Sequence, residues 1–217
     1  MAKKELTNDE LLQLTNDLKN SASGKRRSAA KKIGKNEIIQ LGDELYNAYL
    51  KEREDKRTWE TQTEMILALG KIGYQKALPE LKHIIDKNEP HDMVTIASAR
   101  SYVRLKRKDL NDAQPVIELL KTGNFSVISG ATSILTFDDM KPSISEIETI
   151  ISIFDGKKEE EIAIKGYGDI REYLISAMSK WDKKLCAEYL NQFINADNAK
   201  LKAIAEDALK GKKSRYE

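Results

Sequence analysis

Apolar residues recur at intervals of three and four positions through most of the chain, a pattern that predicts amphipathic helices. Residues 63–73 (TEMILALGKIG) carry one such stripe, and residues 76–86 (KALPELKHIID) carry a second. Gly70 and Gly73 lie between the stripes, where we expect the first helix to end and the chain to turn. Pro79 falls in the first turn of the second helix, where a missing amide hydrogen costs nothing. Sustained alternation of period two is lacking, so the pattern favours helices over strands.

This pair of predicted helices recurs along the chain. Leu69 and Leu105 are 36 residues apart, and so are Pro79 and Pro115, which indicates that one helix pair has been copied. Pro142 is expected to begin a helix of a further copy in the same way. Apolar residues near the ends of the first helices mark the copies, at spacings of 36, 36, 32, 44 and 28 residues: Ile33, Leu69, Leu105, Phe137, Trp181 and Leu209. Spacings of this size are typical of solenoid proteins.

The residues ALGKIG at 68–73, followed by ALPELKHII at 77–85, resemble a HEAT repeat of the bacterial type that also occurs in phycocyanobilin-lyase-like proteins. The resemblance is clearest over residues 25–121 and weaker over residues 125–211. It implies an all-α fold, an α-solenoid in which residues 1–217 form one HEAT-like domain of about five to six repeats. It also implies a right-handed superhelix of helix pairs whose second helices line a concave face, usually the binding face. Such a fold is nearly silent on function.

Composition narrows the class of protein further. The chain has 217 residues, of which 33% are charged and 6% aromatic, as expected for an elongated body with much surface. The N-terminal residues MAKKELTNDELL contain no apolar run, so we expect no secretory signal. No stretch approaches 18 apolar residues, so we expect no membrane contact and a cytoplasmic location. Cys186 is the only cysteine, which excludes an intramolecular disulfide and suggests a small buried side chain.

The net charge of +2 conceals a segregation of charge. Residues 25–35 carry six basic residues and no acidic one, whereas residues 36–50 carry three acidic residues and no basic one. If the second helices line the concave face, that face is acidic and favours a protein partner with a basic or mixed surface. The candidate binding residues on that face are Asp43, Glu44, Glu118, Glu146 and Glu148. Taken singly, each is more readily explained as an ordinary solvated acid.

Nucleic acid is the alternative partner. The basic first helices offer side chains that can neutralise phosphates: Lys25, Arg26, Arg27, Lys31, Lys32, Arg100 and Arg104. This alternative is weaker because a solenoid that cradles DNA should carry its positive charge on the concave face. Some HEAT-like proteins are alkylpurine DNA glycosylases, which need aromatic, Asp and Arg side chains converging there. Trp181 and Asp182 are the nearest such fragment, and they lie at the end of a predicted helix.

Candidate catalytic and metal-binding residues are scarce. The two histidines, His83 and His91, are not followed by glutamate, as the HEAT-like di-iron hydroxylases require, and they are not spaced for any metal site. No phosphate-binding glycine loop is present. We therefore predict no cofactor, no metal and no catalytic residue, and a non-catalytic protein–protein interaction scaffold. Residues 156–169 are an insertion relative to the repeat; they are either a binding loop or a loop whose isoleucines pack back onto the core.

Overall fold

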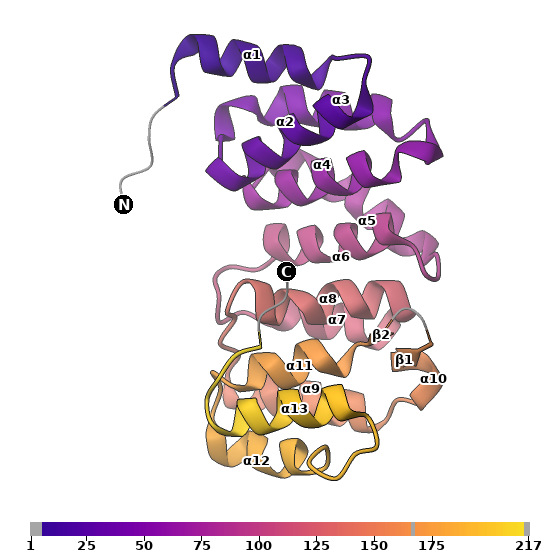
Figure 1. The fold of residues 1–217 in the computed structure, drawn as a ribbon, viewed down its shortest axis with the longest axis vertical. Helices are drawn as coiled ribbons and strands as arrows, with labels where there is room; N and C mark the ends of the chain where they lie inside the picture. The colour runs from indigo at the N-terminus through magenta and orange to yellow at the C-terminus, as the bar shows by residue number, and fades with distance from the viewer. Residues whose placement is uncertain (1–5, 166–167, 215–217) are drawn as a thin grey trace. The chain divides into compact units, whose positions relative to one another are not determined.

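The computed structural model describes residues 6–165 and 168–214, and within them the protein is all-α. These residues form thirteen α-helices, packed mostly on their sequence neighbours, and one pair of two-residue strands (Figure 1). The helices group in two compact units. The first unit comprises the residues up to 87 together with 92–106, and the second comprises 88–91 and the residues from 107 onward. No described helix has the length and apolar composition that a membrane span requires.

The first unit contains six helices: α1 (Asn8–Leu18), α2 (Ser23–Asn36), α3 (Gly42–Glu52), α4 (Trp59–Lys71), α5 (Leu78–Lys87) and α6 (Met93–Lys106). Short 3₁₀ turns precede three of them: Ile39–Leu41, Lys56–Thr58 and Gln75–Ala77. Helix α4 packs between α2 and α6, while α3 and α5 lie against α4 and α6 respectively (Figure 1). Helix α1 covers α2 and α3. Fully buried Ile33, Leu69 and Leu81 form part of the core that these contacts create.

The second unit contains the remaining helices: α7 (Gln114–Thr122), α8 (Phe125–Phe137), α9 (Ile144–Asp155), α10 (Glu159–Ile162), α11 (Arg171–Met178), α12 (Lys183–Asn191) and α13 (Ala199–Leu209). Helix α11 packs between α8 and α13, and α9 contacts both α7 and α12. Strands β1 (Ala163–Ile164) and β2 (Gly168–Asp169) pair antiparallel, with Ala163 opposite Asp169. As predicted, Pro79 and Pro115 lie in the first turns of α5 and α7. Pro142 instead precedes Ser143, the N-cap of α9.

Several helices end in the same backbone motif. After α2, the amide of Ile38 donates to the carbonyl of Ile33 at 3.1 Å, and after α4 the amide of Tyr74 donates to Leu69 at 3.1 Å. Helix α8 ends alike, with Met140 donating to Leu135 at 3.0 Å. In each case the residue before the donor has a positive φ angle, as a Schellman ending requires: Glu37 at 52°, Gly73 at 70° and Asp139 at 51°. Gly73 therefore ends α4, whereas Gly70 lies inside it.

This motif corrects the predicted repeat position in α8. By analogy with Ile33 and Leu69, the residue at the helix end is Leu135, which is fully buried. Phe137, the residue predicted from the apolar pattern, is 39% exposed. The two tryptophans also differ. Trp181 is buried and donates from its indole nitrogen to the carbonyl of Met140 at 2.8 Å, whereas Trp59 is 45% exposed.

The inserted segment 156–169 folds back on the second unit. It forms α10 and the β1–β2 pair, and α10 packs on α8. Ile162 is buried, and its carbonyl accepts a hydrogen bond of 2.9 Å from the amide of Ile170. Ile164 is only partly buried. One predicted isoleucine therefore packs onto the core, while charged residues of the same segment remain at the surface.

Candidate binding site

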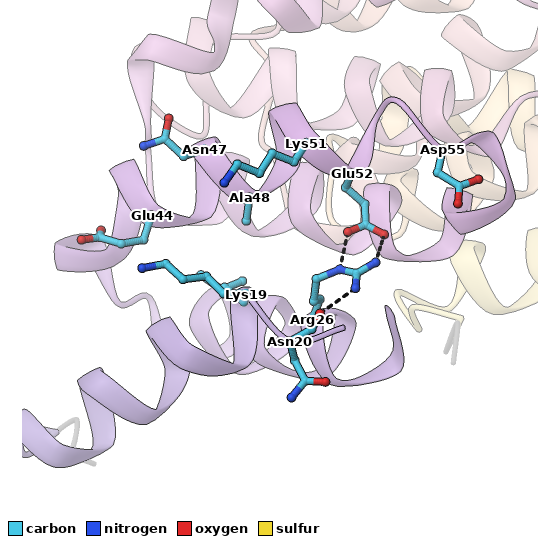
Figure 2. Close-up of a pocket in the computed structure, with 10 residues that line it drawn as sticks. Lys19, Asn20, Arg26, Glu44, Asn47, Ala48, Lys51, Glu52 and Asp55 are labelled. Atoms are coloured by element: carbon cyan, nitrogen blue, oxygen red, sulfur yellow. Dashed lines mark hydrogen bonds and ion pairs between the residues drawn. The ribbon is translucent and has the colours of Figure 1, made fainter. Parts of the chain in front are cut away.

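A groove of about 390 Å³ opens in the first unit between the end of α1, the first turn of α2 and one face of α3 (Figure 2). Its walls combine charged, amide and small apolar side chains. The lining residues are Leu18, Lys19, Asn20, Arg26, Glu44, Asn47, Ala48, Lys51, Glu52 and Asp55. One predicted acidic residue, Glu44, and one residue of the alternative basic set, Arg26, therefore meet in the same groove.

An ion pair between Arg26 and Glu52 forms the floor of the groove (Figure 2). Arg26 Nε donates to Glu52 Oε2 at 2.5 Å, and Nη2 donates to Oε1 at 2.7 Å. Nη1 donates to the carbonyl oxygens of Asn20 at 2.7 Å and Ser21 at 2.8 Å. Hydrogen bonding to Glu52 raises the pKa of Arg26 above its ordinary value, and burial opposes it. Glu52 is only 5% exposed, so this bidentate ion pair is held in the interior. Because Arg26 also binds the carbonyls of the α1–α2 loop, it fixes that loop against α3.

The rim of the groove has a different electrostatic character. Figure 2 shows Lys19, Glu44 and Lys51 extending toward the same end of the groove, with Asn47 beside Lys51. Within the described ranges, neither ammonium group nor the Glu44 carboxylate takes part in an ion pair or hydrogen bond. The floor is thus neutralised internally, while the rim presents two cations, one carboxylate and one amide. Leu18 and Ala48 add small apolar surface between them.

Asp43 lies next to Glu44 in sequence but takes part in another cluster. Its Oδ1 accepts hydrogen bonds from Lys76 Nζ at 2.8 Å and from the Tyr74 hydroxyl. Hydrogen bonding to Lys76, and then to Tyr74, lowers the pKa of Asp43 from its ordinary value. The ring of Tyr74 also contacts Tyr46, with centroids 5.5 Å apart. Asp43 therefore joins α3 to the turn before α5, and its carboxylate is already engaged.

Glu146 corrects the predicted acidic set, because it is a buried structural residue. Only 8% exposed, its carboxylate accepts from the amide of Ala113 at 3.0 Å and from the amide of Ser143 at 2.8 Å. It also accepts from Gln114 Nε2 at 3.3 Å. Glu146 thus caps α9 from within and holds the start of α7. The other two acids of the second unit, Glu118 on α7 and Glu148 on α9, are exposed.

The predicted basic residues divide into engaged and exposed groups. Besides Arg26, Arg27 forms an ion pair, with Glu60. Arg100 and Arg104 are partly buried on α6. The ammonium groups of Lys25, Lys31 and Lys32 are exposed on α2 and, in the part of the chain with described coordinates, unpaired. Of the predicted basic residues, these three lysines are the ones that are both exposed and unpaired within the described part of the chain.

Sequence reasoning missed most of the groove, namely Lys19, Asn47, Lys51, Glu52 and Asp55. A signal for α1 was present, since Thr7 and Glu10 form a capping box whose spacing is visible in the sequence. The pairing of Arg26 with Glu52 had no local signal, because 26 residues separate them.

The described side chains form no metal-binding cluster, and the single thiol lies in the interior. No group of three or more His, Cys, Asp and Glu residues there is arranged to hold a metal ion. His83 is exposed on α5, and the ring of His91 contacts that of Phe125 with centroids 5.8 Å apart. Cys186 is fully buried, as predicted. In comparisons with known proteins, no family model matches this sequence and no curated protein does.

Proposed function

We propose that this protein is a non-catalytic protein–protein interaction scaffold built as a HEAT-like α-solenoid, and that the α1–α3 groove contacts the partner. The observation that carries the proposal is the rim of unpaired Lys19, Glu44 and Lys51 around a floor neutralised by Arg26 and Glu52. The side-by-side packing of α2, α4 and α6, whose sequences carry the 36-residue spacing, supports the repeat architecture.

The charges on the rim favour a protein partner over a phosphate backbone. A nucleic acid would bring like charge against Glu44, whereas a protein surface of mixed charge can pair with both signs. The groove also offers apolar contact at Leu18 and Ala48, which a phosphate backbone does not use. We therefore infer a partner with a surface of mixed charge, which places cations against Glu44 and carboxylates against Lys19 and Lys51, and expect its association to slow as ionic strength rises.

The test is a charge swap on the rim. Partners captured from a native extract are identified, and their affinity is measured with the Glu44→Lys, Lys51→Glu double variant, which leaves the net charge unchanged. We expect affinity to fall about tenfold or more. The comparison variant, Lys31→Glu with Lys32→Glu, alters two exposed lysines of α2 and should have a much smaller effect. If the Lys31→Glu, Lys32→Glu variant loses affinity while the rim variant keeps it, and the captured complex contains nucleic acid, the basic surface of α2 is the binding surface instead.

A further inference from the structure

A second pocket lies wholly within the second unit. It has a volume of about 540 Å³ and is bounded by the end of α9, the segment leading into α10, and helices α12 and α13. Lys157, Glu159 and Ile162 of the inserted segment line it. The insertion that the sequence singled out thus forms part of the wall of a pocket.

The interior of this pocket is organised by Arg171. Its Nε donates to Asp169 Oδ1 at 2.9 Å, and its Nη2 lies 2.5 Å from Asp169 Oδ2 and 2.6 Å from Glu159 Oε1. The guanidinium carbon lies 5.7 Å from the ring centroid of Phe193. The positive charge of Arg171 is therefore neutralised by two carboxylates, and the same side chain joins α10, β2 and the turn after α12. The other lining cation, Lys157, lies 4.0 Å from Glu161.

Negative charge remains after these pairs are formed. Asp155 and Asp197 both line the pocket, are exposed, and have no ion pair or hydrogen bond within residues 6–165 and 168–214. The lining residues and their direct partners comprise five carboxylates against two cations: Asp155, Glu159, Glu161, Asp169 and Asp197 against Lys157 and Arg171. The pocket consequently has a negative electrostatic potential.

Tyr189 supplies a polar group that points to a ligand independently of the acids. It lines the pocket, is only 3% exposed, and its hydroxyl has no hydrogen-bond partner among the described residues. Burial, followed by the nearby Asp155, raises the pKa of Tyr189, so the hydroxyl stays protonated at neutral pH. The hydroxyl oxygen is not one of the fully enclosed polar atoms that lack a partner, so it opens onto the pocket, where the N–H group of a ligand can reach it.

An anionic ligand is disfavoured at the helix N-terminus that borders the pocket. The first turn of α13 borders the pocket, but the side-chain oxygen of Asn198 already accepts from the amides of Lys200 at 3.1 Å and Leu201 at 3.2 Å. These amides are therefore occupied, and the unpaired groups that line the pocket include two carboxylates, the neutral hydroxyl of Tyr189 and the side-chain amide of Gln192.

We propose that this pocket receives a basic side chain, arginine or lysine, from a protein segment. The cation pairs with Asp155 and Asp197, and its N–H groups donate to the Tyr189 hydroxyl oxygen. The inference rests on the proposed function only in taking the bound molecule to be a protein. It concerns different residues in the other unit, so either site can fail alone.

The experiment uses the full chain and three blocked tripeptides, Gly-Arg-Gly, Gly-Lys-Gly and Gly-Glu-Gly, with binding followed by NMR chemical-shift changes. We expect the arginine or lysine peptide to shift Tyr189 and Phe193 signals, and the glutamate peptide to leave them unchanged. Asp155→Asn with Asp197→Asn should weaken binding about tenfold or more, and Tyr189→Phe should weaken it while keeping the ring.

The control variant, Glu160→Gln with Glu188→Gln, removes the same charge from exposed residues of α10 and α12 that do not line the pocket. It should change the affinity less than about twofold. The Glu44→Lys, Lys51→Glu rim variant should bind the peptides as the natural chain does, which separates this site from the groove. Absence of shifts with both basic peptides, equal shifts with the glutamate peptide, or equal weakening by the control would each overturn the proposal.

Discussion

A β-carbon on Gly70 would lie 2.6 Å from the hydroxyl oxygen of Ser101 and 2.9 Å from its Cα atom, so α4 and α6 cross where only glycine fits. The Ser101 hydroxyl uses this proximity to donate to the carbonyl of Ile66 at 2.9 Å. Gly34, 36 residues earlier, stands in the same relation to the next helix, because its β-carbon would lie 2.9 Å from the Cα atom of Ala68. Two close helix crossings in the first unit thus depend on glycines at equivalent positions.

Gly70→Ala should therefore destabilise the protein. Alanine favours a helix over glycine by about 1 kcal/mol, but here the added methyl meets backbone that cannot move without shifting α6. Overpacking of this kind costs about 1–3 kcal/mol, so we expect a net loss in the free energy of unfolding by urea titration. Gly24→Ala is the matched control, since nothing lies within 4 Å of its β-carbon position in α2. Equal stability of the two variants would contradict the close crossing.

The corrected repeat position in α8 can be tested by comparing two truncations. Leu135→Ala removes a fully buried side chain and should cost about 2–5 kcal/mol. Phe137→Ala removes a larger side chain that is 39% exposed, and should cost clearly less despite its ring contact with Tyr173. Thermal unfolding of both variants measures the difference. A larger loss for Phe137→Ala would restore the position taken from the sequence.

The helices and their 36-residue spacing could be predicted because most of them are amphipathic, with a stripe that the apolar pattern reveals. Helix α8 is the exception, since every residue from Phe125 to Thr136 is buried. Because the helix has no polar face, the apolar pattern does not show which residue occupies the repeat position, and Phe137 was predicted instead of Leu135. The Schellman hydrogen bond that identifies Leu135 belongs to the backbone, which apolar spacing does not report.

Glu146 and Glu148 allow the stability contributed by a buried capping carboxylate to be compared with that of a surface carboxylate. Glu146→Ala leaves the amides of Ala113 and Ser143 without their acceptor, and should cost about 1–3 kcal/mol. Glu148→Ala, two positions later on the exposed side of α9, should change stability by less than about 0.5 kcal/mol. Urea unfolding of both variants decides the matter. Similar small losses would mean that Glu146 is a surface acid after all.

The residues of the candidate site could be predicted less well than the helices, and Glu146 and Arg26 show why. Ser143 and Glu146 have capping-box spacing, so the sequence did carry a signal that Glu146 is structural. Counting the charges of each helix could not reveal this structural role, because a carboxylate that points into the core and one that points into solvent contribute the same charge. The Arg26–Glu52 pair depends on how α2 and α3 pack, and counting charges likewise grouped Arg26 with the basic residues of the first helices that can neutralise phosphates.

Cys186 should react slowly with thiol reagents in the folded protein. It is fully buried, and burial, with a smaller contribution from Asp182, raises the pKa of its thiol to about 12. The thiolate, which is the reactive form, is therefore scarce at neutral pH. The rate of reaction with an aromatic disulfide reagent should rise by orders of magnitude when the protein is unfolded in guanidinium chloride. Equal rates in the folded and unfolded protein would mean that the thiol is accessible in the native state.

The Asp43 cluster predicts a specific acid titration. Because its pKa is lowered in the folded protein, the Asp43 carboxylate stabilises the fold above its unfolded pKa of 3.8, and this contribution disappears as pH falls through the lowered folded value. The carboxyl ¹³C signal of Asp43 should thus titrate below pH 3.8. Lys76→Met removes the larger of its two hydrogen bonds and should raise that midpoint, and Tyr74→Phe should raise it by less. Lys82→Met removes an exposed lysine that pairs with Asp86 instead, and should leave the Asp43 midpoint unchanged. If all three variants titrate alike, the ion pair between Asp43 of α3 and Lys76 of the turn before α5 does not form in solution.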